Sequence, residues 1–312
     1  MNPRIRPGEP ESYLARLRPH YFFRFSFFRH TFNFDCLKWM GYTILSKETL
    51  APGITRFEIE APLIARKALP GQFVIIRVTE KGERIPLTIV DTDPERGSLS
   101  IVVLEAGRTT KLLSSLEPGQ TLLNCVGPLG RPTEINLYGE VACVGGGVGV
   151  ACLYPVVRGL KQAGNKILTM IGARTAQLLI FEQELRRWSD ELLVSTDDGS
   201  RGHKGLVHEL LKRALEEGRR PNLVYAVGPV LMMKAIAEVT KPYQIKTLAS
   251  LNPIMVDGTG MCGSCRVEVG GRMRFACVDG PEFDAHQVDF DLLLKRNQRY
   301  LEEEKLSATL HG

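Results

Sequence analysis

Residues 257–265 read Asp-Gly-Thr-Gly-Met-Cys-Gly-Ser-Cys, and a further cysteine follows at position 277. Four side chains that could bind a metal, Asp257, Cys262, Cys265 and Cys277, therefore follow the pattern D-x4-C-x2-C-x11-C. The glycines between them have no Cβ, so they allow the tight turns that bring several ligands around one centre. Backbone N–H groups in such turns can point at thiolate sulfurs. The segment therefore predicts a metal-binding loop.

A C-x4-C-x2-C spacing with a more distant fourth cysteine is that of plant-type [2Fe–2S] centres. Asp257 stands at the first ligand position, and iron accepts carboxylate oxygen as well as thiolate sulfur. The favoured interpretation is a [2Fe–2S] cluster held by Asp257, Cys262, Cys265 and Cys277, or by the three cysteines and water. A redox-active dithiol or a zinc site with the same four residues is the alternative.

The composition is typical of a globular protein, with 44% hydrophobic and 24% charged residues. Its 312 residues are enough for two domains and a small additional module. The formal net charge is +5, and residues 1–40 contribute seven Lys/Arg against three Asp/Glu. The nearly neutral remainder gives no support for nucleic-acid binding. Cys125, Cys143 and Cys152 lie in apolar stretches, which predicts buried free thiols and a reducing, cytoplasmic location.

No membrane span is expected, because the longest uncharged run, 141–157, is interrupted by glycines and Pro155. Residues 21–29 read Tyr-Phe-Phe-Arg-Phe-Ser-Phe-Phe-Arg, and the arginines break the apolar core that a signal peptide needs. An interfacial membrane anchor is an alternative for this stretch. Since Met40 directly precedes the first strand-like segment, residues 1–39 are expected to be a poorly ordered extension or a misassigned start.

The chain divides into segments with different periodicity. Residues 41–137 alternate short strand-like runs with Pro-Gly turns, which predicts an antiparallel barrel with strands over 42–48, 54–60, 72–79, 85–91, 98–106 and 121–126. Residues 138–250 alternate strands with helices, as in a parallel sheet. Here we expect strands over 140–144, 166–171, 191–195, 222–227 and 245–249, and helices over 177–188, 205–217 and 229–240. Residues 251–285 form the cluster module, and 286–312 hold a surface helix over 289–304 and a polar tail.

A glycine-rich turn, Val141-Ala-Cys-Val-Gly-Gly-Gly-Val-Gly149, follows a predicted strand and opens a helix. Phosphate groups bind at helix N-termini, outside the carboxyl ends of parallel strands. We therefore expect a dinucleotide to approach the backbone of Gly145, Gly146, Gly147 and Gly149, with a purely structural turn as the alternative. Gly228-Pro229 ends another predicted strand and is expected in the same pocket. Residues 196–200 end a third strand and belong either to this pocket or to a plain polar turn.

Two barrel segments are candidates for flavin contacts. In Arg84-Ile-Pro-Leu-Thr88, the Thr88 hydroxyl can bond a flavin edge or a phosphate. In Gly107-Arg-Thr-Thr110, Gly107, the following N–H groups and Thr110 can cradle a pyrophosphate. Exposed strand ends without a ligand are the alternative for both segments.

A barrel, an α/β domain and a C-terminal cluster loop in this order resemble the ferredoxin–NADP reductase superfamily. Over about residues 41–284 the chain is most similar to the electron-transfer subunits of bacterial dihydroorotate dehydrogenase. It is also similar to their relatives, the small (alpha) subunits of NADH-dependent reduced ferredoxin:NADP oxidoreductase, also called sulfide dehydrogenase beta subunits. The most specific stretches are Leu251-Asn-Pro-Ile-Met-Val-Asp-Gly-Thr-Gly-Met-Cys-Gly-Ser-Cys-Arg and Phe275-Ala-Cys-Val-Asp-Gly-Pro. An aspartate at the first ligand position resembles the oxidoreductase branch, since the dihydroorotate branch normally has four cysteines.

The resemblance implies FAD in the barrel, NAD(H) in the α/β domain and a cluster with one Asp and three Cys ligands. By motif, Pro86, Leu87 and Thr88 would line the isoalloxazine, and Gly107 and Thr110 would hold the FAD phosphates. The turn from Gly145 to Gly149 and Gly228-Pro229 would bind NAD(H). Two positions depart from the superfamily pattern. Ile85 stands where an arginine is usual, with Arg84 one residue earlier, and Val227 replaces the cysteine often found before Gly-Pro.

The three cofactors that the resemblance implies define a function in electron transfer. Nicotinamide exchanges hydride, a [2Fe–2S] cluster exchanges single electrons, and FAD supports both steps. We therefore expect an oxidoreductase subunit without a catalytic acid or base. It would pass electrons to a larger flavoprotein or iron–sulfur partner and, through that complex, to or from ferredoxin. An electron-bifurcating NADH/ferredoxin/NADP enzyme is the favoured interpretation, and a dihydroorotate dehydrogenase subunit is the alternative. A non-enzymatic nucleotide-binding protein with a zinc knuckle is a more distant one. The choice between NAD and NADP stays open.

Overall fold

The computed structural model describes residues 41–304 and 306. The expectations for residues 1–39, including the possible membrane anchor, and for the end of the tail lie outside this range. Within the described range, none of the helices combines the length and the apolar character that crossing a membrane requires.

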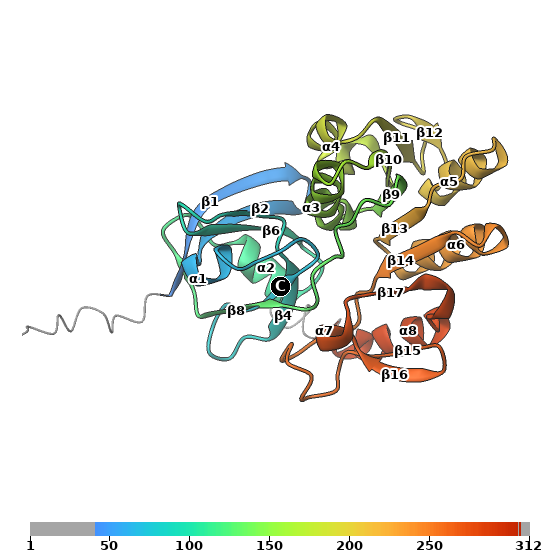
Figure 1. The fold of residues 1–312 in the computed structure, drawn as a ribbon. Coiled ribbons are helices and arrows are strands. Elements are labelled where there is room, and N and C mark those ends of the chain that lie inside the picture. The colour runs from blue at the N-terminus through green and yellow to red at the C-terminus, as the bar shows by residue number, and fades with distance from the viewer. Residues whose placement is uncertain (1–40, 305, 307–312) are drawn as a thin grey trace, which may run out of the picture. The chain divides into compact units, whose positions relative to one another are not determined.

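The first part of the chain forms two antiparallel sheets around one apolar core (Figure 1). The larger sheet has the order β5-β6-β2-β1-β7, with β1 Tyr42–Ala51, β2 Ile54–Glu60, β5 Asp91–Asp93, β6 Ser98–Leu104 and β7 Thr121–Leu122. The smaller has the order β4-β3-β8, with β3 Phe73–Arg77, β4 Arg84–Thr88 and β8 Asn124–Leu129. Fully buried side chains such as Phe57, Ile76 and Leu99 come from both sheets. The predicted antiparallel barrel is confirmed.

The barrel differs from the prediction where the chain turns between sheets. The predicted strand 85–91 is two strands, because the chain leaves the smaller sheet after Thr88 and joins the larger one at Asp91. The predicted strand 121–126 is likewise split into β7 and β8. Two short helices, α1 (Pro62–Ala65) and α2 (Arg108–Ser114), were not predicted. The start of α2 is closed by the Thr110 hydroxyl, which accepts a hydrogen bond from the Gly107 N–H at 3.0 Å.

The second part is a seven-stranded sheet with the order β12-β11-β10-β9-β13-β14-β17. Its strands are β9 Glu140–Gly146, β10 Lys166–Ala173, β11 Glu191–Thr196, β12 His203–Lys204, β13 Leu223–Val227, β14 Lys246–Ser250 and β17 Glu282–Asp284. All neighbours are parallel except β14 and β17. One apolar core lies under α3 (Gly149–Gln162) and α4 (Glu182–Trp188), and a second under α5 (Val207–Glu216) and α6 (Val230–Thr240). The predicted fold class, a barrel followed by a parallel-rich α/β sheet, is confirmed.

Two predicted helices are interrupted. Residues 177–188 contain a short 3-10 helix, η2 (Ala176–Leu178), and then α4, because Phe181 adopts a left-handed backbone with φ of 58°. The Phe181 ring is buried against Tyr154, with ring centroids 5.3 Å apart, and this contact stabilises the break. The helix expected over 289–304 is α8 (Phe290–Asn297), followed by a turn at 298–300 and a further helical stretch at 301–304. Another 3-10 helix, η3 (Lys241–Tyr243), follows α6.

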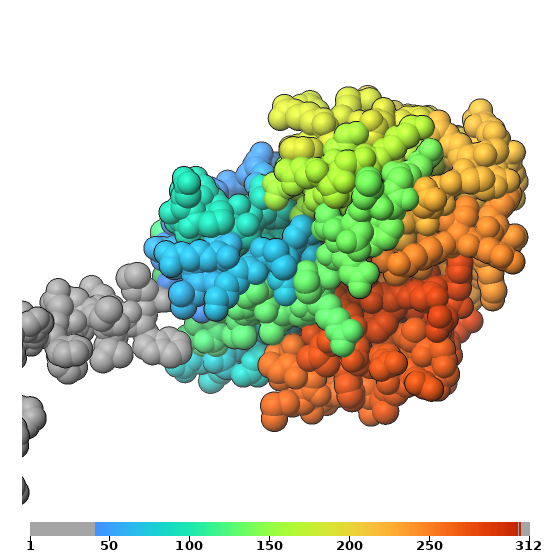
Figure 2. Space-filling view, in the orientation of Figure 1, coloured from blue at the N-terminus to red at the C-terminus, as the bar shows by residue number. Residues whose placement is uncertain are grey.

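The C-terminal module contacts both preceding parts. It contains the hairpin β15 (Arg266–Val269) and β16 (Arg272–Phe275), then α7 (Ala276–Asp279), β17, η4 (Ala285–Gln287) and α8. Strand β17 pairs antiparallel with β14, with Phe283 opposite Ala249, so the module extends the main sheet. Buried Cys265 and Cys277 share an apolar core with Ile75 of barrel strand β3. In Figure 2 the green segment that leaves the barrel lies against the red C-terminal module.

One buried asparagine organises the connection between the barrel and the sheet. The Asn165 Oδ1 accepts hydrogen bonds from the N–H groups of Tyr138 at 2.7 Å and Gly139 at 3.1 Å. Its Nδ2 donates to the carbonyls of Asn136 at 2.8 Å and Leu160 at 2.7 Å. The linker is therefore fastened to the end of α3 by a single side chain.

We expect Asn165→Ala to destabilise the protein by about 2–4 kcal/mol, because it removes four hydrogen bonds to buried or partly buried backbone groups. The midpoint of urea unfolding measures this loss. Asn136→Ala is the matched control, since its exposed side chain lies on the same linker and should change stability by no more than about 0.5 kcal/mol. Equal shifts for the two variants would contradict the role assigned to Asn165.

Candidate active site

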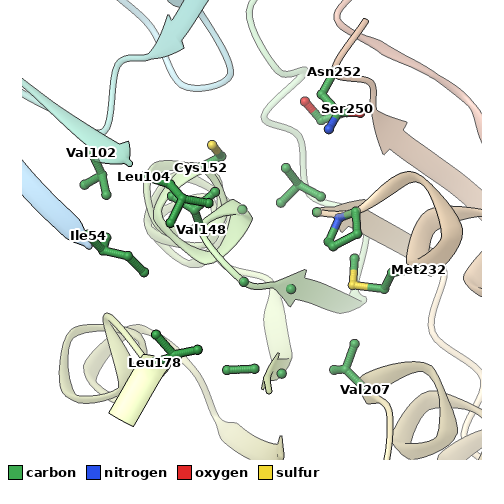
Figure 3. Close-up of a pocket in the computed structure, with 18 of the residues that line it drawn as sticks. Ile54, Val102, Leu104, Val148, Cys152, Leu178, Val207, Met232, Ser250 and Asn252 are labelled. Carbon is green, nitrogen blue, oxygen red and sulfur yellow. The ribbon is translucent and has the colours of Figure 1, made fainter. Parts of the chain in front are cut away.

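A cavity of about 770 Å³ lies where the barrel meets the carboxyl ends of the parallel strands (Figure 3). The volume lies in the range of ligand and cofactor sites. The barrel contributes Ile54, Pro86, Leu87, Thr88, Val102, Leu104 and Thr110. The α/β domain contributes the strand ends and helix starts, namely residues 146–149, Cys152, residues 172–174, Leu178, Asp197, residues 206–208, residues 227–229, Leu231, Met232 and Ser250. Asn252, at the start of the C-terminal module, completes the lining.

The glycine turn after β9 has two physical roles. Gly147 adopts a φ of +55°, and nothing lies within 4 Å of the position that its Cβ would occupy, so the backbone opens into the cavity. A Cβ on Gly149 would lie 2.8 Å from the Gly228 Cα, so the start of α3 and the end of β13 meet backbone to backbone. A Cβ on Gly146 would collide with the Met232 side chain.

The predicted phosphate turn is therefore only partly in the cavity. Gly146, Gly147, Gly149, Gly228 and Pro229 all line it. Gly145 does not, because a Cβ there would meet Leu153 and Val150 of α3, which indicates a packing role. Their assignment as cofactor contacts stays a prediction.

On the barrel side, the three consecutive residues Pro86, Leu87 and Thr88 of β4 line the cavity as a group. Thr110 lines it too, although its hydroxyl already accepts hydrogen bonds from the N–H groups of Ala106 and Gly107 at 3.0 Å. Gly107 itself lies outside the lining, with open space around its Cβ position. Arg84 is exposed at the start of β4 and is not part of the wall.

Most of the remaining wall is apolar and was not predicted. Ile54, Val102, Leu104 and Leu178 surround the cavity in Figure 3, together with the start of α3. Such a lining suits a flat aromatic ring and excludes water from it. The barrel residues carry no distinguishing motif, because an apolar strand residue looks the same whether it faces a core or a cavity.

Cys152 and His208 line the cavity, although neither was predicted there. Cys152 was interpreted as a buried thiol, but it is half-buried and lines the cavity, where its thiol donates to the Thr88 Oγ1 at 3.2 Å. Burial raises the pKa of Cys152, which keeps the thiol neutral. His208 is half-buried at the start of α5 and lines the cavity as well. Cys125 and Cys143 are buried as predicted.

Charged side chains line the cavity at the ends of two neighbouring strands. Arg174 directly follows β10, and Asp197 directly follows β11. The predicted participation of residues 196–200 is therefore limited to Asp197. Ser200 instead accepts a hydrogen bond from the Ala176 N–H at 2.8 Å, which makes the rest of this segment a structural turn.

The four predicted cluster ligands fall into two pairs. The Sγ atoms of Cys265 and Cys277 lie 3.2 Å apart and are buried. Burial and the neighbouring Cys265 raise the pKa of Cys277 to about 12. Asp257 accepts hydrogen bonds from the N–H groups of Thr259 and Cys262, each at 2.7 Å, and the first of these lowers its pKa. The Cys262 side chain is exposed.

This donor set fits a two-iron cluster. In the described part of the chain, no three His, Cys, Asp or Glu side chains converge on one position that could hold a metal ion. A tetrahedral zinc site needs four ligands around one point, whereas a [2Fe–2S] centre takes two protein ligands at each iron. The adjacent thiols of Cys265 and Cys277 match the second requirement for one iron, Asp257 contacts Cys262 through its backbone N–H, and the role of each residue stays a prediction.

The cluster loop packs against the barrel next to the cavity wall. Gly258 has a φ of +76°, and its Cβ would lie 2.6 Å from the Leu129 Cδ1 and 2.9 Å from the Ile75 Cγ1. Ile75 pairs with Pro86 across β3 and β4, and Pro86 lines the cavity. The loop therefore contacts β3, the strand next to the one that lines the cavity.

Comparisons with known proteins agree with this architecture. An oxidoreductase FAD-binding domain matches residues 42–133, and an oxidoreductase NAD-binding domain matches residues 143–238. The iron–sulfur cluster binding domain of dihydroorotate dehydrogenase B matches residues 252–289. FAD, NAD and an iron–sulfur cluster are therefore the cofactors of this oxidoreductase.

Similar proteins include an electron transfer subunit homolog of dihydroorotate dehydrogenase B (NAD(+)) from Thermotoga maritima. It is 52% identical over 85% of this chain and 93% of its own length. The electron transfer subunit of the same enzyme from Desulforamulus reducens is 34% identical over 78% and 96%. A solved chain of an NADH-dependent reduced ferredoxin-NADP oxidoreductase, studied for flavin-based electron bifurcation, is 50% identical with a TM-score of 0.82, covering 86% of this chain and 96% of that one. The chain belongs to the family of dihydroorotate dehydrogenase B electron transfer subunits and their homologs.

Proposed function

We propose that this chain passes electrons between NAD(H), FAD and a [2Fe–2S] cluster to a larger flavoprotein partner. The complex would be an electron-bifurcating NADH/ferredoxin/NADP oxidoreductase, with ferredoxin reached through the partner. One observation carries the proposal. The cavity combines a barrel wall with the glycine turn after β9, and the cluster loop packs through Gly258 on Ile75, in the strand next to that wall. This arrangement would place the three carriers in series.

The residues of the chain would bind and orient the carriers. Pro86, Leu87 and the apolar wall would hold the flavin ring and exclude water, and the Thr88 hydroxyl would meet its polar edge. Gly147 would let the nicotinamide dinucleotide approach the backbone. Bound FAD supplies the chemistry that joins hydride transfer to single-electron transfer. The proposal needs no catalytic acid or base from the protein.

The location of the loop supports an external electron acceptor or donor. Met261, in the middle of the loop, is 89% exposed, and Cys262 beside it is exposed as well. A partner could therefore come close to the Asp257/Cys262 pair without rearrangement of the core. A cytoplasmic location stays a prediction.

Two observations favour the bifurcating complex. Asp257 replaces the first cysteine of the spacing, and a solved oxidoreductase chain of that kind is 50% identical. The second candidate, an electron-transfer subunit of dihydroorotate dehydrogenase, is favoured by the names of the relatives and of the cluster domain.

The two candidates are distinguished by purifying the native complex and identifying the partner by mass. We expect a flavoprotein with additional iron–sulfur clusters, and NADP⁺ reduction that requires both NADH and reduced ferredoxin. A partner that oxidises dihydroorotate with NAD⁺ would establish the second candidate instead.

Gly147→Asn should weaken NADH binding, since it adds a side chain where the backbone opens into the cavity. Asparagine tolerates the left-handed conformation, so the fold should be retained. We expect the Kd for NADH to rise roughly tenfold or more, equivalent to about 1.4 kcal/mol, with FAD and iron contents unchanged. Titration of NADH binding measures this effect. The control is Gly119→Asn, at a barrel turn that is also left-handed and open but outside the cavity. An unchanged Kd would remove the turn from the nucleotide site.

Asp257→Cys should retain a [2Fe–2S] cluster, because it completes the four-cysteine spacing, but with a shifted spectrum and reduction potential. Asp257→Ala should lose or destabilise the cluster while FAD stays bound. Iron content and electron paramagnetic resonance of the reduced protein test both expectations. Glu268→Ala, which removes a carboxylate from the neighbouring hairpin, should behave like the parent. If both Asp257 variants keep the parent's signal and potential, Asp257 is not a ligand.

A further inference from the structure

A polar cluster of the half-buried Glu282 and two buried hydroxyl groups lies where the barrel, the α/β sheet and the C-terminal module meet. The Glu282 carboxylate on β17 accepts hydrogen bonds from the Thr133 hydroxyl and from the Tyr225 hydroxyl, the latter at 2.7 Å. Thr133 lies on the segment that leaves the barrel, and Tyr225 lies in the middle of β13. Both donors are buried, and Tyr225 is only 1% exposed. One carboxylate therefore joins three parts of the fold.

Neighbouring residues pack closely around the Glu282 carboxylate. A Cβ on Gly71, in the turn before β3, would lie 2.8 Å from the Glu282 Oε1 and closer still to Thr133. Backbone hydrogen bonds flank the carboxylate. The Arg131 N–H donates to the Gly280 carbonyl at 2.7 Å, and the Leu251 N–H donates to the Pro281 carbonyl at 2.9 Å. The segment that follows Cys277 is thereby fastened to both the barrel exit and β14.

The position of Glu282 is electrostatically costly. Within residues 41–304 and 306 it forms no ion pair, and burial raises its pKa above the ordinary value. An apolar triad of similar volume would avoid this desolvation cost. Directional hydrogen bonds differ from apolar contacts in that they hold their partners at a defined distance and angle.

The polar cluster is connected along the chain to both the cavity and the iron–sulfur cluster loop. Strand β13 continues from Tyr225 to Gly228 and Pro229 at the cavity wall, and Ser250, at the end of β14, lines the cavity too. Toward the cluster loop, a short segment joins Cys277 to Glu282. Pro281 in this segment packs on the barrel, because a Cβ on Gly130 would lie 3.1 Å from the Pro281 Cδ. A displacement at Glu282 would change the separation between the cavity and the loop.

We propose that Glu282 is a positioning residue that sets the distance between the flavin-binding cavity and the cluster loop. The inference rests on the proposed function. Of the two electrons and one proton that leave NADH as hydride, one electron ends on the cluster, and the other electron stays on FAD with the proton. Electron transfer slows steeply as the separation of donor and acceptor grows, so this second step, and not hydride transfer, depends on Glu282.

The kinetic test compares Glu282→Ala and Glu282→Gln in the full chain, loaded with FAD and the cluster to equal measured contents. After rapid mixing with NADH, flavin absorbance reports the first step and freeze-quenched paramagnetic resonance of the cluster reports the second. For Glu282→Ala we expect the first rate to stay within about twofold and the second to fall roughly tenfold or more, as small misplacements do in other sites. Glu282→Gln should retain most of the second rate, because its carbonyl can accept both hydrogen bonds.

A structural measurement is independent of activity. Hydrogen exchange at the Arg131 and Leu251 amides should be faster in Glu282→Ala and close to the parent in Glu282→Gln. The matched control is Thr247→Val. The Thr247 hydroxyl on β14 is buried and donates a hydrogen bond to the Thr240 hydroxyl on α6 at 2.7 Å. That variant loses a buried hydrogen bond without touching the barrel, so neither the second rate nor these amides should change. Tyr225→Phe removes one of the two hydrogen bonds to Glu282 and should slow the second step less than Glu282→Ala does. It takes the place of Glu282→Ala in this test if Glu282→Ala does not retain its cofactors.

Three outcomes would overturn the proposal. They are a normal second step in Glu282→Ala, an equal slowing of both steps, and an equal effect of Thr247→Val. A parent protein whose cluster is not reduced by NADH would instead overturn the proposed function itself, and with it the role of Glu282.

Discussion

Close approach of the backbone to its neighbours, possible only without a Cβ, is the constraint on which this structure depends. Gly149 against Gly228 brings together the start of α3 and the end of β13, and both glycines line the cavity. Gly258 against the Ile75 side chain seats the cluster loop on the barrel. Any side chain at these positions would push α3 away from β13 or lift the loop. The glycines therefore define where the nucleotide, flavin and cluster sites lie relative to one another.

An apolar wall then determines what the cavity can hold. The barrel presents Ile54, Val102 and Leu104, and the α/β domain adds Leu178 and Met232. A dry wall of this kind lowers the local dielectric and strengthens the few polar contacts inside it, such as that between Cys152 and Thr88. It also keeps water away from a bound hydride carrier.

The C-terminal module is held by two different kinds of interaction. Strand β17 adds to the edge of the main sheet, and the buried cysteines share a core with Ile75 of the barrel. These contacts bury area but tolerate small shifts, because apolar packing is not directional. The hydrogen bonds of Glu282 to Thr133 and Tyr225 are directional and join all three parts at one point. If the module carries electrons as proposed, this second kind of contact would fix its distance to the flavin.

The sequence by itself determined the order of the parts, the metal-binding loop around Asp257 and Cys262, and the glycine turn, because ligand spacing and periodicity are local properties. It could not separate β4 from β5, since the chain changes sheets at a point that only the position of the second sheet defines. It could not place the break at Phe181, whose left-handed backbone depends on a ring contact with Tyr154. It also assigned Gly145 to the nucleotide and Cys152 to the core. Which glycine faces a cavity and which faces a helix is decided by packing between distant segments. For the same reason, the hydrogen bonds of Glu282 exist only in the tertiary structure, where residues far apart in the chain are buried together.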